Sequence, residues 1–180
     1  MIAIARTYAF AAPRERVWQL LMDTNALALC IPGCRSLDPD PDTTNRYRIS
    51  LSVKLAAVMG TYDGTVELVD LTPQQSYGLV AEGKGRPGFV KGKASIALDA
   101  APDTPTTTLT VAGEVQAGGA IARVGQRLLT SAARMMMDRF FKRLKTLAEA
   151  ESHAEFDVAR LEAAEVDSAE QYFDTPADES

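Results

Sequence analysis

Few side chains in this 180-residue sequence have the types and spacings that covalent or acid–base chemistry requires. The only histidine, His153, lies in a glutamate-rich segment near the carboxyl end. A catalytic triad needs a base held beside its nucleophile, and nothing in the pattern provides that for His153. The two cysteines, Cys30 and Cys34, lack the further nitrogen or sulfur ligands that a structural zinc site needs. We therefore predict a non-catalytic protein with no metal site and, in a reducing compartment, no disulfide.

The glycines and basic residues between 83 and 93 have the composition of a phosphate-binding loop. Such a loop stands between a strand and the N-terminus of a helix, whereas this stretch lies between two predicted strands. A hairpin with a basic outer face is the better interpretation. Because the basic residues have no interleaved exposed aromatic side chains and the net charge is −5, the sequence also argues against nucleic acid as a partner.

The most suggestive apolar cluster is Met135-Met136-Met137, followed by Phe140-Phe141. Three consecutive residues of a helix point in three directions, so at least one of these methionines leaves the side that faces the core. Methionine adapts to irregular surfaces and to variable ligands. Core packing and contact with a lipid-like ligand or a partner both stay open for this cluster.

The element that positions this cluster is the stretch 119–147, which has no proline and reads as one helix roughly 40 Å long. Its apolar residues recur at steps of three and four, the spacing of a single helix face. A helix of this length needs a broad apolar surface to lie on. The predicted face consists of Ile121, Val124, Gly125, Leu128, Ala132, Met135, Phe140, Leu144 and Leu147.

Upstream, apolar and polar residues alternate in segments separated by turn residues, which is the pattern of strands. Residues 2–10 are the first such segment. Pro13 then suits the first turn of a short helix from Arg14 to Met22, and Thr24 is the expected cap of a second helix over 25–30. The remaining predicted strands cover 34–38, 45–55, 58–70, 76–85, 89–99 and 106–116.

Short connections make neighbouring strands antiparallel. The seven strands therefore predict one curved antiparallel sheet wrapped around the long helix, an α+β fold in two layers. Glycine within a strand marks a bend or a close approach, which a curled sheet needs. At Gly125 and Ala132 the small residues indicate either close packing of helix on sheet or room left for a ligand, and both interpretations stay open.

Charge divides the chain into two parts. Residues 148–180 hold eleven acidic residues and one arginine, a formal charge of −10, so residues 1–147 carry +5 of the total of −5. We predict a folded domain over 1–147 and an acidic, flexible tail over 148–180. No apolar run is long enough to span a membrane, and the amino terminus is too short and too alternating for a signal peptide. The cytoplasm is the expected location.

Five motifs of the chain resemble the CoxG family of carbon monoxide dehydrogenase proteins, in that family's order and spacing. They cover nearly the whole of 1–147, and nothing is carried over to the tail. The resemblance implies the helix-grip fold shared by START-like and polyketide-cyclase-like proteins, with two short helices after the first strand. The motifs are APRERVWQLLMD at 12–23, CIPGC at 30–34, GTYDGTVEL at 60–68, GFVKGKASIAL at 88–98 and GGAIARVGQRLL at 118–129.

The resemblance further implies an accessory protein of a molybdenum hydroxylase, the kind of enzyme beside which such proteins are usually encoded. It implies an apolar cavity between sheet and long helix, a quinone or lipid as ligand with no covalent cofactor, and recruitment of the hydroxylase to the inner face of the cytoplasmic membrane. The alternative is a small cyclase- or hydratase-type enzyme that uses Tyr8, Tyr62 or Glu114 as acid or base. A structural interaction protein with a filled core is a third hypothesis.

Two sets of expected site residues follow. The cavity mouth is expected near the first three of the residues Leu29, Ile31, Pro32, Val58, Tyr62, Phe89, Gly125, Leu128 and Ala132, which are predicted to contact the ligand. Anionic headgroups or a partner are expected to contact a basic helix face, for which solvation alone is the plainer alternative; this face is Arg123, Arg127, Arg134, Arg139, Lys142 and Arg143.

The acidic tail has three interpretations. It folds back and masks the basic helix face, or it only aids solubility, or it anchors a partner enzyme. The anchoring residues would be Phe156, Leu161, Tyr172 and Phe173.

Overall fold

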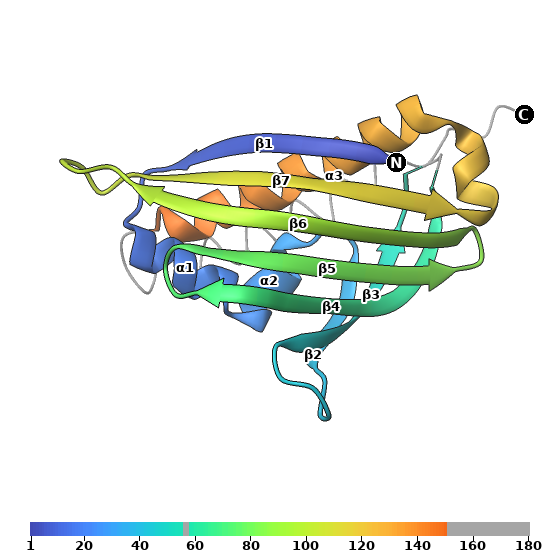
Figure 1. Ribbon diagram of the computed structural model, residues 1–180, viewed down its shortest axis with the longest axis horizontal. Helices are drawn as coiled ribbons and strands as arrows, with labels where there is room; N and C mark the ends of the chain where they lie inside the picture. The colour runs from blue at the N-terminus through green and yellow to red at the C-terminus, as the bar shows by residue number, and fades with distance from the viewer. Residues whose placement is uncertain (56–57, 151–180) are drawn as a thin grey trace, which may run out of the picture.

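The computed structural model describes residues 1–55 and 58–150, which form one curved antiparallel sheet with a long helix across its concave face (Figure 1). The strand order is β1-β7-β6-β5-β4-β3-β2, so β1 pairs with β7 and all other pairs join strands consecutive in the chain. The predicted seven-stranded α+β arrangement is confirmed. The strands are β1 (Ile2–Phe10), β2 (Cys34–Pro39), β3 (Arg46–Val53), β4 (Gly60–Thr72), β5 (Ser76–Gly85), β6 (Gly88–Ala100) and β7 (Thr107–Gly118).

Two short helices, α1 (Arg14–Leu21) and α2 (Thr24–Cys30), follow β1 and lie behind the sheet in Figure 1. The prediction that Thr24 caps the second helix is wrong. The Asp23 carboxylate caps it instead, accepting hydrogen bonds from the backbone N–H groups of Asn25 and Ala26 at 2.9 and 3.3 Å. Aspartate satisfies two of the amide groups that a helix start leaves open, so the helix begins one residue earlier than predicted.

The long helix α3 spans Gln126–Ala148 and is shorter than the predicted stretch 119–147. The residues before it form a 3-10 helix, η1 (Gly119–Val124). Gly125 separates the two with φ at +93°, in the left-handed region that favours glycine. The turn at Gly125 ends one helix and starts another, so the apolar spacing does not run through it.

This interruption changes which side of α3 faces the sheet. The sequence predicts Leu128 and Met135 on the buried side, but they are 53% and 40% exposed. Their neighbours Leu129 and Met136 turn toward the sheet instead. In the second half of α3, Leu144 and Leu147 are fully buried, as predicted.

The packed core fills only one end of the space under the sheet. There α1, α2 and the last turns of α3 meet strands β5, β6 and β7 around side chains such as Phe10, Val17, Leu109, Leu144 and Leu147, all 0% exposed. Burying an aliphatic or aromatic side chain of this kind contributes about 1.5–3 kcal/mol. This end supplies the apolar core of the fold.

Candidate functional site

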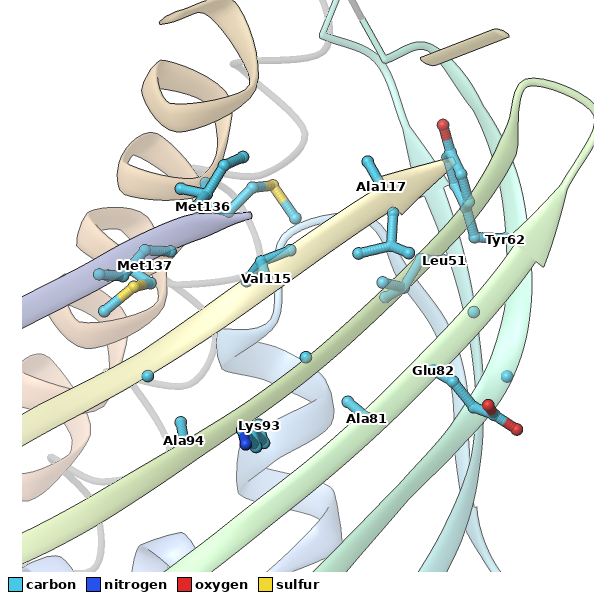
Figure 2. Close-up of a pocket in the computed structure, with 18 of the residues that line it drawn as sticks. Leu51, Tyr62, Ala81, Glu82, Lys93, Ala94, Val115, Ala117, Met136 and Met137 are labelled. Atoms are coloured by element: carbon cyan, nitrogen blue, oxygen red, sulfur yellow. The ribbon is translucent and has the colours of Figure 1, made fainter. Parts of the chain in front are cut away.

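An apolar cavity of about 440 Å3 lies between the first half of α3 and the concave face of the sheet (Figure 2). Every strand except β2 contributes to its wall, together with η1 and α3. It begins where the packed core ends, because Leu79, Ala94, Val111 and Met137 belong to both. The helix–sheet interface is therefore packed at one end and hollow at the other.

Small residues on the central strands create this space. The strand register places Gly83 of β5 between Gly64 of β4 and Val90 of β6. One step along the same face, Ala81 lies beside Gly92. Because alternate residues of a strand face the same side, these glycines and alanines leave volume in the middle of the sheet, where larger side chains would otherwise meet α3.

The four glycines in the wall of the cavity fall into two pairs. At Gly64 and Gly113 an added Cβ atom would overlap a backbone carbonyl of the neighbouring strand, so glycine allows the strands to approach. At Gly83 the nearest atoms to an added Cβ lie at 3.8 and 3.9 Å, and at Gly92 at 3.4 and 3.5 Å. The sheet could therefore accept a side chain at Gly83, and its absence there is empty volume.

The helical side of the cavity is formed by Leu129, Ala132, Ala133, Met136 and Met137 (Figure 2). The two alanines leave room below the helix, and the two methionines are flexible enough to fit ligands of different shape. The methionine cluster is thus divided, since Met136 and Met137 border the cavity while the preceding methionine is exposed.

Tyr62 is the polar side chain of the wall that is best placed for chemistry. It is 6% exposed, and its hydroxyl donates a hydrogen bond to the Val58 carbonyl oxygen at 2.7 Å. Burial raises the pKa of Tyr62, so the hydroxyl stays protonated at neutral pH. The Tyr62 proton is already used within the protein, and the group is a poor base.

The charged residues of the wall turn their side-chain ends to the outside of the sheet. Lys93 Nζ and Glu114 Oε1 form an ion pair at 2.9 Å, with the side chains 71% and 37% exposed. Lys91 and Glu82 form a second pair at 3.7 Å on exposed side chains. Because these groups are solvated on the outer face, the cavity offers hydrocarbon contacts and not charge.

Three exposed apolar side chains stand next to the cavity. Met59, Leu128 and Met135 are 60%, 53% and 40% exposed. Each is the direct sequence neighbour of a residue that lines the cavity. Met59 belongs to the connection between β3 and β4, and the other two belong to α3. We call these three residues the apolar rim.

The structure brings only some of the nine expected ligand contacts together. Those among the lining residues are Val58, Tyr62 and Ala132. Those outside the lining are Leu29, Ile31, Pro32, Phe89, Gly125 and Leu128.

The misplaced residues have simple physical reasons. Phe89 faces outward because the alternation that turns Val90 into the cavity turns its neighbour away, and the Phe89 ring lies against Gly118. Gly125 has no atom within 4 Å of an added Cβ and lies in the turn before α3. Leu128 is rotated to the exposed side by the change of helix phase at that turn.

Leu29, Ile31 and Pro32 form the end of α2 and the turn after it. The turn is fixed against β3, because the Ser52 N–H donates a hydrogen bond to the Gly33 carbonyl at 2.8 Å. These three residues do not line the cavity, so the expected mouth at this turn is replaced by the apolar rim.

The sequence analysis missed most of the wall on the first, third and fifth strands. Ile2, Ile4, Ile49, Leu51 and Ala81 all line the cavity. Their alternation shows that they share the concave face, but it does not show where the helix leaves space. The recurrence of glycine and alanine at inward positions of neighbouring strands is the signal that could have located the cavity.

The basic residues expected on one helix face divide in the same way. Arg123, Arg127, Arg134 and Lys142 are exposed. Arg143 is 5% exposed, so its expected contact with a membrane or partner surface is wrong. It faces inward toward α2, where its charge lowers the pKa of Cys30 and partly offsets the larger rise caused by burial.

The described residues contain no group of three or more His, Cys, Asp and Glu side chains that could hold a metal ion. Cys30 is buried and Cys34 is partly exposed, and both are free thiols. No helix in 1–55 or 58–150 is long and apolar enough to cross a membrane. His153 and the expected anchors Phe156, Leu161, Tyr172 and Phe173 lie outside the described residues.

This combination of a curved seven-stranded sheet, two short helices and a long carboxyl-terminal helix over a cavity is the helix-grip fold of START-like proteins. The sequence profile of the carbon monoxide dehydrogenase protein CoxG matches residues 7–149, so the chain belongs to the CoxG family. The comparison with curated proteins finds no match.

Solved structures support the same assignment. A conserved protein from Geobacillus kaustophilus is 34% identical with a TM-score of 0.76, and the match covers 80% of this chain and 93% of that one. A START superfamily protein from Mycobacterium smegmatis is 14% identical with a TM-score of 0.60, covering 82% and 96%. The di-domain ARO/CYC BexL from the BE-7585A biosynthetic pathway is 15% identical with a TM-score of 0.59, covering 82% of this chain and 47% of that one. The last two show the fold alone.

Proposed function

We propose that this protein binds an apolar small molecule, a quinone or a lipid, in the cavity under α3, and does no chemistry on it. The observation that carries the proposal is the cavity itself, because about 440 Å3 of apolar space falls in the usual range of ligand pockets, about 300–1,000 Å3. A filled core would leave no such space. Its one buried hydroxyl, on Tyr62, is already hydrogen-bonded to Val58.

The chemistry of the wall favours a hydrocarbon chain as the buried part of the ligand. A polar headgroup inside would lose its hydrogen bonds to water without replacement, which costs several kcal/mol at worst. If a methylene occupies about as much space as a water molecule, roughly 30 Å3, the cavity has room for a chain on the order of ten carbons. The tail would lie under α3, and the headgroup would stay at the apolar rim.

We further propose that the protein works as an accessory to a molybdenum hydroxylase of the carbon monoxide dehydrogenase kind at the inner face of the cytoplasmic membrane. Membership of the CoxG family supports the partner. The exposed Arg123, Arg127 and Arg134, together with the apolar rim, support the membrane, since basic and apolar side chains side by side suit an anionic lipid surface. Mixing purified hydroxylase, the full chain and vesicles of anionic lipid tests this assembly, and a hydroxylase that stays off the vesicles in the presence of the chain contradicts it.

A small cyclase- or hydratase-type enzyme is the second candidate, because one structural neighbour is an ARO/CYC protein. Of the residues expected to act as acid or base, Tyr62 borders the cavity, Tyr8 is not in the lining, and the Glu114 carboxylate pairs with Lys93 outside the sheet. Turnover that is lost in Tyr62→Phe while ligand binding is retained would favour this candidate.

The direct test is a titration followed by methyl NMR. Decylubiquinone and palmitate, added separately to the full chain with 13C-labelled methionine, should shift the methyl signals of Met136 and Met137 and leave that of Met22 unchanged. Mass spectrometry of an organic extract of the purified protein identifies any ligand carried from the cell. Unchanged Met136 and Met137 signals at saturating concentrations of both probes would refute ligand binding in this cavity.

A further inference from the structure

A second feature of α3 lies outside the cavity, on the exposed side of its first half. Gln126, Arg127, Thr130, Ser131 and Arg134 line a shallow surface groove there, which we call the basic groove. Gln126 Nε2 donates to the Met1 carbonyl at 3.4 Å, so the groove lies on the side of α3 next to the start of β1. The apolar cavity lies under the same stretch of helix but is lined by other residues.

The two arginines of the basic groove have no carboxylate in ion-pair distance within 1–55 and 58–150. Other exposed cations of the domain do have one, such as Arg6 with Asp138 at 3.6 Å and Lys93 with Glu114 at 2.9 Å. Arg127 and Arg134 are two turns apart, about 10 Å along the axis. Guanidinium groups bind carboxylates with two parallel hydrogen bonds, so the groove is suited to a ligand with several carboxylates.

The chain itself supplies such a ligand. After Ala150 it continues for thirty residues, 151–180, with ten acidic residues and one arginine. The family profile ends at residue 149, so this segment is an addition to the family's domain. Its densest acidic cluster is Glu162, Glu165, Asp167 and Glu170.

The acidic cluster can reach the groove whatever its conformation. Arg134 lies about 20 Å from the carboxyl end of α3 and Arg127 about 30 Å, at 1.5 Å per residue. The cluster begins twelve residues after Ala150, and twelve to twenty residues span about 20–30 Å as a helix and more than that when extended. Covalent attachment at a matching distance gives a high effective concentration, so weak individual ion pairs suffice.

We propose that the acidic cluster 162–170 docks in the basic groove and pairs with Arg127 and Arg134. The docked tail competes with any external anionic surface for the same two arginines, and it is released when a stronger anionic partner or high salt replaces it. This contact does not depend on the proposed ligand function, since the groove and the cavity share no lining residue.

The test uses the full chain and two matched variants of equal charge. One replaces Glu162, Glu165 and Glu170 by Gln. The other, the control, replaces three acids further along, as Asp174→Asn, Asp178→Asn and Glu179→Gln. The side-chain Nε signals of Arg127 and Arg134 are recorded by NMR at about 0.02 M salt and at about 1 M salt, where the Debye length falls to about 3 Å.

Docking predicts that high salt shifts both arginine signals in the wild type and the control. In the 162/165/170 variant the signals should lie at the high-salt position already at low salt. Equal effects of both variants would mean diffuse attraction without a docked segment, and no effect of salt or variant would mean no contact; either result overturns the proposal. If only added anionic vesicles move the signals, the groove binds membranes and not the tail, which also overturns it.

Discussion

The Tyr8 hydroxyl of β1 donates a hydrogen bond to Asp138 Oδ1 of α3 at 2.8 Å, joining residues 130 positions apart in the sequence. The Tyr8 ring also stacks on Phe141, with centroids 4.1 Å apart. Both contacts fall on α3 beyond the part that covers the cavity. They fix the helix to the edge strand, so that the hollow half of the interface extends from an anchored half.

Removing this hydroxyl should reduce stability and leave the cavity unchanged. Tyr8→Phe keeps the stacking but loses the hydrogen bond, so we expect the free energy of unfolding to fall by about 0.5–1.5 kcal/mol. Burial, followed by the Asp138 contact, raises the pKa of Tyr8, so the bond persists well above neutral pH. Chemical denaturation at pH 7 measures the change, with Tyr47→Phe as control. A loss of decylubiquinone binding in Tyr8→Phe at unchanged stability would contradict the anchoring role.

Filling the cavity from the sheet side should abolish ligand uptake without harming the fold. Gly83→Val places its side chain in the empty volume with ordinary contacts to Tyr62 and Asp63, at 3.8 and 3.9 Å from the Cβ. Replacing glycine in a strand should leave stability equal or higher by about 0.5–1 kcal/mol. We expect at least about tenfold weaker binding of decylubiquinone and palmitate, which corresponds to about 1.4 kcal/mol.

The matched control for this variant is Ala112→Val, which adds bulk to an exposed position of the outer face of β7. It should bind both probes as the wild type does. Unchanged binding by folded Gly83→Val would show that the ligand does not occupy the middle of the sheet.

The buried thiol of Cys30 should make the protein less stable in alkali. Burial raises the pKa of Cys30 from 9.0 to about 12, partly offset by Arg143. The stability contributed by the neutral thiol is therefore complete below pH 9 and is lost as pH rises toward 12, by up to about 1.4 kcal/mol per pH unit. Urea denaturation from pH 8 to pH 10.5 should show a shallower decline for Cys30→Ala than for the wild type. Parallel curves would contradict the burial of a titrating thiol.

The apolar rim should contribute to membrane binding in addition to charge. Leu128→Gln with Met135→Gln removes exposed apolar surface and creates no cavity in the core, because these side chains are 53% and 40% exposed. We expect several-fold weaker sedimentation with anionic vesicles that persists at high salt, where basic contacts are screened. Val80→Gln, exposed on the outer sheet face, is the control. Equal binding of the double variant and the wild type would remove the rim from the interface.

Strands were easier to predict from this sequence than the cavity. Each predicted strand lies within two residues of the observed one, because alternation and turn residues such as Pro73 and Pro87-Gly88 are local signals. The long helix depends on a backbone conformation at Gly125 that spacing does not reveal. A helix continued through this residue acquires the wrong phase, which placed Leu128 inside.

Three members of the wall could be predicted from the sequence, and most could not. Tyr62 is an inward aromatic residue flanked by glycines, and Ala132 is a small residue on a long helix; both patterns suggest a site. Ile2 and Leu51 look like ordinary strand core residues. Whether an inward residue meets a partner or empty space depends on the opposite layer, and therefore on packing far away in the sequence.

The division of the helix–sheet interface into a packed end and a hollow end has a consequence for how loading is sensed. Around Leu144 the amide hydrogens are protected by a core that exists with or without ligand. Around Leu129 and Met136 they have only the cavity beneath them, so their exchange with solvent should slow when a ligand fills it. The exposed side of the same turns carries Arg127 and Arg134. A macromolecule that touches these turns therefore meets a stiffer helix when the protein is full, and occupancy is legible from outside without any change in shape.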